Sequence, residues 1–143
     1  MSNWDKNLFI DHLRGQCTRE VAKVGVAIIE FTEKHADDIS WGRGTDHGTL
    51  TFRCDTDVGP LPLFHMTSTG QLNLQINFMR NKEIPPMVLR DVVLKLESNF
   101  LRDYDEESYP SDSYEPLEEL ICTKAQLDSF IKTIEGCTYR LKQ

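Results

Sequence analysis

Several features that mark metal-binding, secreted or membrane proteins are missing from this sequence of 143 residues. Its four cysteines stand at positions 17, 54, 122 and 137, so no two of them form the C-x-x-C pair typical of zinc sites. No run approaches the ~20 apolar residues that a membrane-spanning helix needs. Residues 1–13 lack the apolar core of a secretory signal. We therefore expect reduced cysteines in a cytoplasmic protein that does not enter a membrane.

Positive charge is also scarce, and the balance of charge is uneven along the chain. The whole sequence has 16 Lys and Arg against 23 Asp and Glu, a net charge of −7. Residues 103–119 contain no base and most of the excess acid, namely Asp103, Asp105, Glu106, Glu107, Asp112, Glu115, Glu118 and Glu119. The remainder is close to neutral. We predict one domain over residues 1–143, with an acidic loop containing Tyr and Pro at about 103–119.

Apolar residues recur with the 3.6-residue period of an amphipathic helix in several segments. The clearest is 18–35, where Val21, Val24, Ile28 and Phe31 form one stripe and Thr18 precedes it as an N-cap. Further helices are expected over residues 4–13, over 87–100 behind two prolines, and from the Thr123–Gln126 capping box onward.

Between residues 49 and 79 the apolar period changes to two, as in strands with one buried face. Three strands are predicted over 49–54, 61–67 and 71–79, with Leu50, Phe52, Cys54, Leu72, Leu74, Ile76 and Phe78 turned inward. Such an open sheet cannot hide its apolar face alone. The expected fold class is α+β, a three-stranded antiparallel β-meander packed on one face by N-terminal and C-terminal amphipathic helices in the order α-β-β-β-α-α.

A Gly-rich turn from Trp41 to Gly48 joins the helical and strand segments. Its glycines permit positive φ and close backbone approach, and exposed amides beside Arg43 would suit an anion. Phosphate-binding loops usually lead into a helix, however, whereas this turn leads into a strand. Two interpretations stay open: a structural corner with Trp41 in the core, or ligand contact by Arg43 and His47.

The second candidate surface is the polar face of the sheet, which alternation assigns to Thr49, Thr51, Arg53, Asn73, Gln75 and Asn77. Amides and an arginine there would contact a protein or phosphates, although this face lacks the aromatic residues that stack on single-stranded nucleic acid. A simply solvated face is the alternative. The candidate binding residues from both surfaces are Trp41, Arg43, Gly44, His47, Arg53, Asn73, Gln75 and Asn77.

Catalytic chemistry has weaker support in the sequence. A metal site would use His47, Asp55, Asp57 and His65, but the two aspartates also fit ordinary turn chemistry before Gly59-Pro60. The strand order invites comparison with restriction-type nucleases, yet Gln75-Ile76-Asn77 lacks the lysine of their Glu-x-Lys or Gln-x-Lys motif. Cys54 and Cys137 occupy apolar-stripe positions, which favours buried thiols over nucleophiles.

The run from Ile39 to Leu50 resembles a pattern of the form W-G-[KR]-G-x-x-x-G-[ST]-[FL], found in uncharacterised bacterial domains. The resemblance covers about residues 20–140 and implies the helix before the motif, the Gly70 hairpin strand after it, and two closing helices. Thr67 stands where those domains usually have an aromatic residue, and the loop before the last helix is more acidic. The resemblance implies no established activity.

We expect a non-enzymatic binding module whose partner is a protein, without catalytic residues or a cofactor. The alternative is a nucleic-acid-associated or degenerate nuclease-like protein that depends on a metal. A third reading is a subunit that forms homo-oligomers through an open sheet edge.

Overall fold

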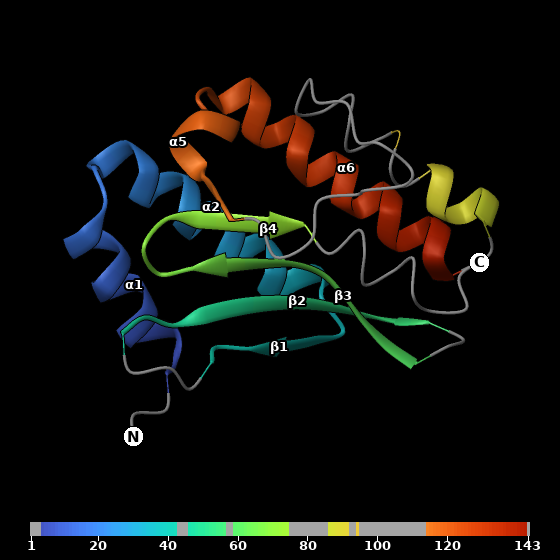
Figure 1. Cartoon of the computed structure of the whole chain (residues 1–143), viewed down its shortest axis with the longest axis horizontal. Helices are drawn as coiled ribbons and strands as arrows, with labels where there is room; N and C mark the ends of the chain where they lie inside the picture. The colour runs from blue at the N-terminus through green and yellow to red at the C-terminus, as the bar shows by residue number, and fades with distance from the viewer. Residues whose placement is uncertain are drawn as a thin grey trace.

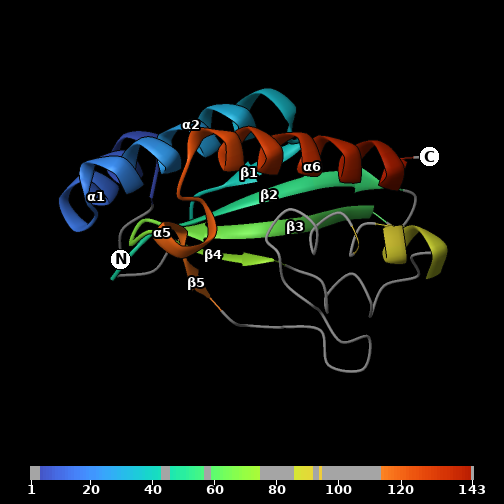
Figure 2. The same ribbon diagram turned by 90° about the horizontal axis from the view of Figure 1, so that it is seen from above.

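The computed structural model describes residues 4–42, 46–56, 59–74, 86–91, 94 and 114–142. A sheet of antiparallel strands forms one layer, and the long helices lie side by side along one of its faces (Figures 1 and 2). The chain runs through α1 (Lys6–Gln16), α2 (Arg19–His35), β1 (Asp38–Ser40), β2 (Thr49–Thr56), β3 (Gly59–Thr67), β4 (Gln71–Leu74), β5 (Glu115–Pro116), α5 (Leu117–Leu120) and α6 (Lys124–Lys142). Residues 86–91 are also helical.

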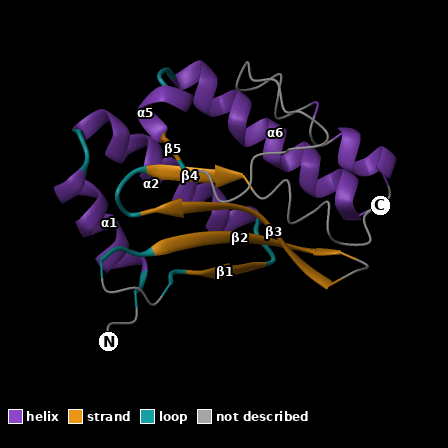
Figure 3. Ribbon diagram, in the orientation of Figure 1, coloured by secondary structure: helices purple, strands orange, loops and turns teal. Residues whose placement is uncertain are grey.

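The sheet confirms the α+β class and corrects the number of strands. Within the described residues it has five strands in the order β1-β2-β3-β4-β5, all neighbours antiparallel, instead of the predicted three (Figure 3). The two missed strands are the edges, and they have three and two residues. Segments this short show no alternation, and β5 lies within the stretch predicted as an acidic loop, which therefore ends in β5 and α5.

The predicted inward faces are confirmed wherever the structure describes them. Leu50, Phe52, Cys54, Leu72 and Leu74 are all buried. The register pairs Phe52 with Phe64, and a bulge follows between Phe52 and Arg53. The bulge interrupts the alternation in β3, because the extra residue, Leu63, is buried together with its neighbours Pro62 and Phe64. Ile76 and Phe78 lie outside the described residues.

The helix boundaries follow their caps. Asp5 accepts a hydrogen bond from the backbone N–H of Leu8 and starts α1, which continues past Gly15 and so is longer than predicted. The predicted N-cap Thr18 accepts from the N–H of Val21. The predicted capping box is confirmed too, because the N–H of Gln126 reaches Thr123 and the Gln126 side chain accepts from the N–H of Thr123.

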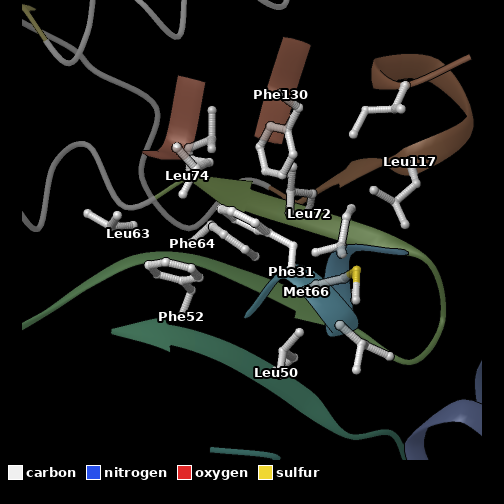
Figure 4. Packing of buried hydrophobic residues seen from close by; sticks show 14 of the residues in the cluster. Phe31, Leu50, Phe52, Leu63, Phe64, Met66, Leu72, Leu74, Leu117 and Phe130 are labelled. Carbon is white, nitrogen blue, oxygen red and sulfur yellow. The ribbon is translucent and has the colours of Figure 1, made fainter. Parts of the chain in front are cut away.

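Four phenylalanine rings form a continuous row through the core (Figure 4). Phe31 of α2 stacks on Phe52 of β2 with ring centroids 5.6 Å apart, and Phe52 stacks on Phe64 of β3 at 5.3 Å. Phe130 of α6 meets Phe64 edge-on at 5.5 Å. Aromatic pairs of this kind contribute about 0.5–1.5 kcal/mol each beyond their buried area. The row therefore binds both long helices to the centre of the sheet.

All four cysteines are free thiols. Cys54 and Cys137 are buried, as predicted, and burial raises the pKa of the Cys54 thiol to about 11. Cys17 is half-buried and Cys122 is exposed. In the described part of the chain, no helix has the length and apolar composition needed to cross a membrane.

The turn between β3 and β4 generates a stability prediction. Gly70 has φ +85°, and a Cβ there would lie 2.7 Å from Cys17 Sγ. Gly70→Ala should lower the free energy of unfolding by about 2 kcal/mol, because a left-handed conformation and a steric clash both penalise the methyl group. The matched control is Gly15→Ala in α1, where nothing lies within 4 Å of an added Cβ. The free energy of unfolding of that variant should rise by up to ~1 kcal/mol, because alanine favours the helix more than glycine does. Urea unfolding measures both, and equal effects would contradict the prediction.

Candidate binding surfaces

The described part of the Gly-rich turn makes contacts within the fold. The Trp41 ring packs edge-on against Phe9 of α1, with centroids 5.6 Å apart. The Trp41 carbonyl accepts from the N–H of Thr49 at 3.0 Å, and the Gly42 carbonyl accepts from the N–H of Trp4 at 3.4 Å. Gly42 has φ +87°. These residues close the chain between β1 and β2 and anchor the N-terminal segment, whereas Arg43 and Gly44 lie outside the described residues.

The far end of the turn is joined to α1 through a buried serine. Ser68 Oγ accepts from the N–H of Gly48 at 2.9 Å, and its other partner is His12 Nδ1 at 2.7 Å. A Cβ on Gly48 would lie 2.9 Å from both Trp4 and Phe9, so the backbone approaches these rings closely. A Ser–His pair also occurs in hydrolases, but Ser68 is 0% exposed and offers no access to a substrate. The pair is therefore a structural contact that connects α1 to the sheet. His47, next to it, is half-buried.

A polar row crosses four strands on the sheet face opposite the helices. The register aligns Ser40, Thr51, His65 and Asn73 on neighbouring strands. Thr51 Oγ1 and His65 Nδ1 share a hydrogen bond of 2.7 Å. Burial lowers the pKa of His65, and the positive charge of Arg53 lowers it further. Both effects favour the neutral form of the His65 imidazole.

The candidate binding residues on this face are less open than alternation alone suggests. Thr51 is 3% exposed and Asn73 is 2% exposed. Arg53 is half-buried and donates to Ser40 Oγ at 2.9 Å, with Asp38 at 3.5 Å on its other side. Alternation identifies which side of a strand a residue faces, but it does not reveal whether that side is covered. Gln75 and Asn77 lie outside the described residues.

The residues of the alternative metal site are spread along the sheet. His47 precedes β2 and Asp55 lies near its end, so about 25 Å separates them at roughly 3.3 Å per residue. His65 pairs with Thr51 in the middle of the hairpin, and Asp57 lies outside the described residues. Within the described ranges, no group of three or more His, Cys, Asp or Glu side chains is arranged to hold a metal ion.

A groove that the sequence did not predict lies between the first turns of α2 and α6. We call it the α2–α6 groove; its volume is about 560 Å³. The described residues that line it are Thr18, Glu20, Val21, Lys23, Val24, Glu118, Ile121, Cys122, Thr123, Lys124 and Leu127. Val21, Val24 and Leu127 are only half-buried there, although their helical stripe is otherwise typical of core positions. The groove thus has an apolar floor and a rim of both charge signs.

No single segment of the sequence signals this groove. Val21 and Val24 continue the stripe of Ile28 and Phe31, so the periodicity predicts all four as core residues. Ile28 and Phe31 are fully or nearly fully buried. What distinguishes the valines is that Leu127, about a hundred residues later, is their neighbour across the groove. Only the packing of α2 against α6 reveals it.

Comparison with protein-family models, with curated proteins and with solved structures found no match to this chain. The resemblance to the bacterial W-G-[KR]-G domains stays a prediction. Function is therefore inferred from the chemistry of the described surfaces.

The four cysteines differ enough in exposure to give a test of the groove. Cys122 lies on its rim, and its thiol donates to the Glu118 carbonyl at 2.9 Å. Iodoacetamide should alkylate Cys122 first and Cys17 more slowly, because Cys17 is partly buried and burial raises the pKa of its thiol. Cys54 and Cys137 should react only after unfolding. Peptide mapping by mass spectrometry measures the order, and early alkylation of Cys54 would contradict this arrangement.

His65 should make the stability depend on pH. Because its pKa is lowered by folding, the unfolded chain takes up a proton as pH falls below about 6.5 while the folded chain resists it. The free energy of unfolding should therefore be highest above that pH and fall below it. His65→Gln should flatten this part of the profile, because it removes the group whose pKa folding lowers. Denaturant unfolding between about pH 5 and 7 measures the slope, and an unchanged slope in His65→Gln would refute the assignment.

Proposed function

We propose that this domain is a non-enzymatic module that binds a protein partner through the α2–α6 groove. The observation that carries the proposal is that Val21, Val24 and Leu127 are only partly buried where they line the groove beside buried Ile121. Covering such apolar surface is favourable by roughly 25 cal/mol per Å². A groove between two helices suits one or two apolar side chains of an amphipathic segment.

The rim of the groove supports a protein partner better than a polyanion. The rim has two acids, Glu20 and Glu118, and two bases, Lys23 and Lys124, so their charges balance. Polar rims around apolar centres are typical of protein interfaces, where they favour specificity. Nucleic acid would instead be matched by a surface that is positive throughout.

The surfaces predicted from sequence stay secondary candidates. The side chains of Trp41 and Arg53 are already in contact with Phe9 and Ser40, so binding there would compete with contacts inside the fold. Association through a sheet edge is disfavoured because β1 and β5 have only three and two residues with which to pair.

Selection of short random peptides displayed on phage tests the proposal. Peptides that bind the wild type should carry paired apolar residues and should bind Val24→Glu at least about tenfold more weakly, because an unpaired carboxylate would be buried under them. Ala27→Glu is the matched control: it adds the same charge to α2 at a residue that does not line the groove. It should bind as the wild type does.

Nuclear magnetic resonance then locates the bound peptide. Amide shifts should concentrate at the starts of α2 and α6, and the peptide should protect Cys122 from alkylation. Peptides that bind Val24→Glu and the wild type equally well, with shifts clustered elsewhere, would overturn the proposal.

A further inference from the structure

A basic depression lies on the other flank of α2. It is formed by Arg14 at the end of α1 together with Arg19 and Lys23 in the first turns of α2, over an apolar floor of Ala22 and Val26. Its volume is about 430 Å³. We call these five residues the basic depression. The described lining contains three cations and no acid, which is unusual in a chain of net charge −7.

The three cations are available to a partner. All three are exposed, and among the described residues none of them forms an ion pair. Some other bases of the domain do form ion pairs: Arg53 lies beside Asp38, and Lys142 binds Asp37 at 2.7 Å. The positive charges of the basic depression therefore repel one another until an anion lies between them.

The basic depression and the α2–α6 groove are neighbours. Lys23 lines both of them. It lies on the outer face of α2, with the α2–α6 groove on one side and the basic depression on the other. A segment that fills the groove with apolar side chains and continues across α2 would reach Arg14 and Arg19. The two surfaces together form one composite surface, apolar on one side and positive on the other.

We infer that the partner of this domain carries a run of Asp and Glu next to the apolar residues that enter the groove, and that Arg14, Arg19 and Lys23 bind this run. The inference rests on the proposed function, since it extends the same binding surface. Three cations over an apolar floor match a short acidic segment. A longer polyanion would also meet Glu20 and Glu118 on the rim of the groove and would be repelled by them.

Two synthetic peptides of identical length test the inference. Both carry the apolar residues found by the display selection, and the adjoining residues are Asp and Glu in one peptide and Asn and Gln in the other. Fluorescence anisotropy should show that the wild type binds the acidic peptide about fivefold more tightly at low salt, with the difference shrinking as salt is added. The double variant Arg14→Gln/Arg19→Gln should lose most of this preference, because only Lys23 remains of the three cations.

The control must remove the same charge elsewhere on the helical layer. Lys34→Gln/Lys132→Gln does so at two exposed residues that line neither surface, and it should keep the preference for the acidic peptide. Equal binding of both peptides by the wild type would overturn the inference while leaving the proposed function intact. If neither peptide binds, and if Val24→Glu binds the selected peptides as well as the wild type does, both the inference and the proposed function would be overturned.

Two further measurements exclude other occupants. Duplex DNA and RNA are titrated into the same proteins, and tighter binding than the acidic peptide, lost in Arg14→Gln/Arg19→Gln, would overturn the inference in favour of nucleic acid. Sedimentation over a range of concentrations covers the remaining case. Self-association abolished by that variant would mean that a second copy of this chain occupies the surface, which also contradicts a foreign partner.

Discussion

The row of Phe31, Phe52, Phe64 and Phe130 is the constraint on which the rest of this fold depends. It runs from α2 through β2 and β3 to α6, so each long helix is fixed to its own strand of the central hairpin. Neighbouring strands lie only about 4.8 Å apart, whereas packed helices need about 8–10 Å. Large aromatic rings can fill the difference between these two spacings, because a phenyl side chain can tilt toward a neighbouring helix and still bury its face. Replacing any of the four with a small residue would leave a cavity and weaken the contact between a helix and the sheet.

Along α2, the groove lies well before this row. Phe31 lies in the last turns of α2, whereas Val21 and Val24 precede it by ten and seven residues, or about 15 and 10 Å along the helix axis. Val21 packs instead beside the turn between β3 and β4, where its Cγ1 lies 3.3 Å from a Cβ built on Gly70. The apolar stripe of α2 continues regardless, and its first residues are left half-buried against Leu127. An apolar stripe that is longer than the core beneath it is a surface available to a partner.

Sequence patterns predicted the parts of this protein that repeat a local rule. The alternation of Leu50, Phe52 and Cys54 and the caps at Thr18 and Thr123 depend on residues within a few positions of one another, and all of them are confirmed. The edge strands were missed because two or three residues carry no period. The α2–α6 groove and the basic depression were missed for a different reason: each joins residues from separate helices, and the distance between helices is set by the core.

The position of α1 links the local rules to the composite surface. Gly25 allows α2 to approach Leu13 so closely that any Cβ would collide with it, and His12 is held by Ser68 at the opposite side of the helix end. Arg14 follows these two anchored residues directly, so the packing of α1 helps to place it near Arg19. A partner that meets such a surface loses little free energy to ordering the backbone of the domain, and only the long side chains of the cations must settle. Affinity and charge preference should therefore depend on the packing of α1 as much as on the arginines themselves.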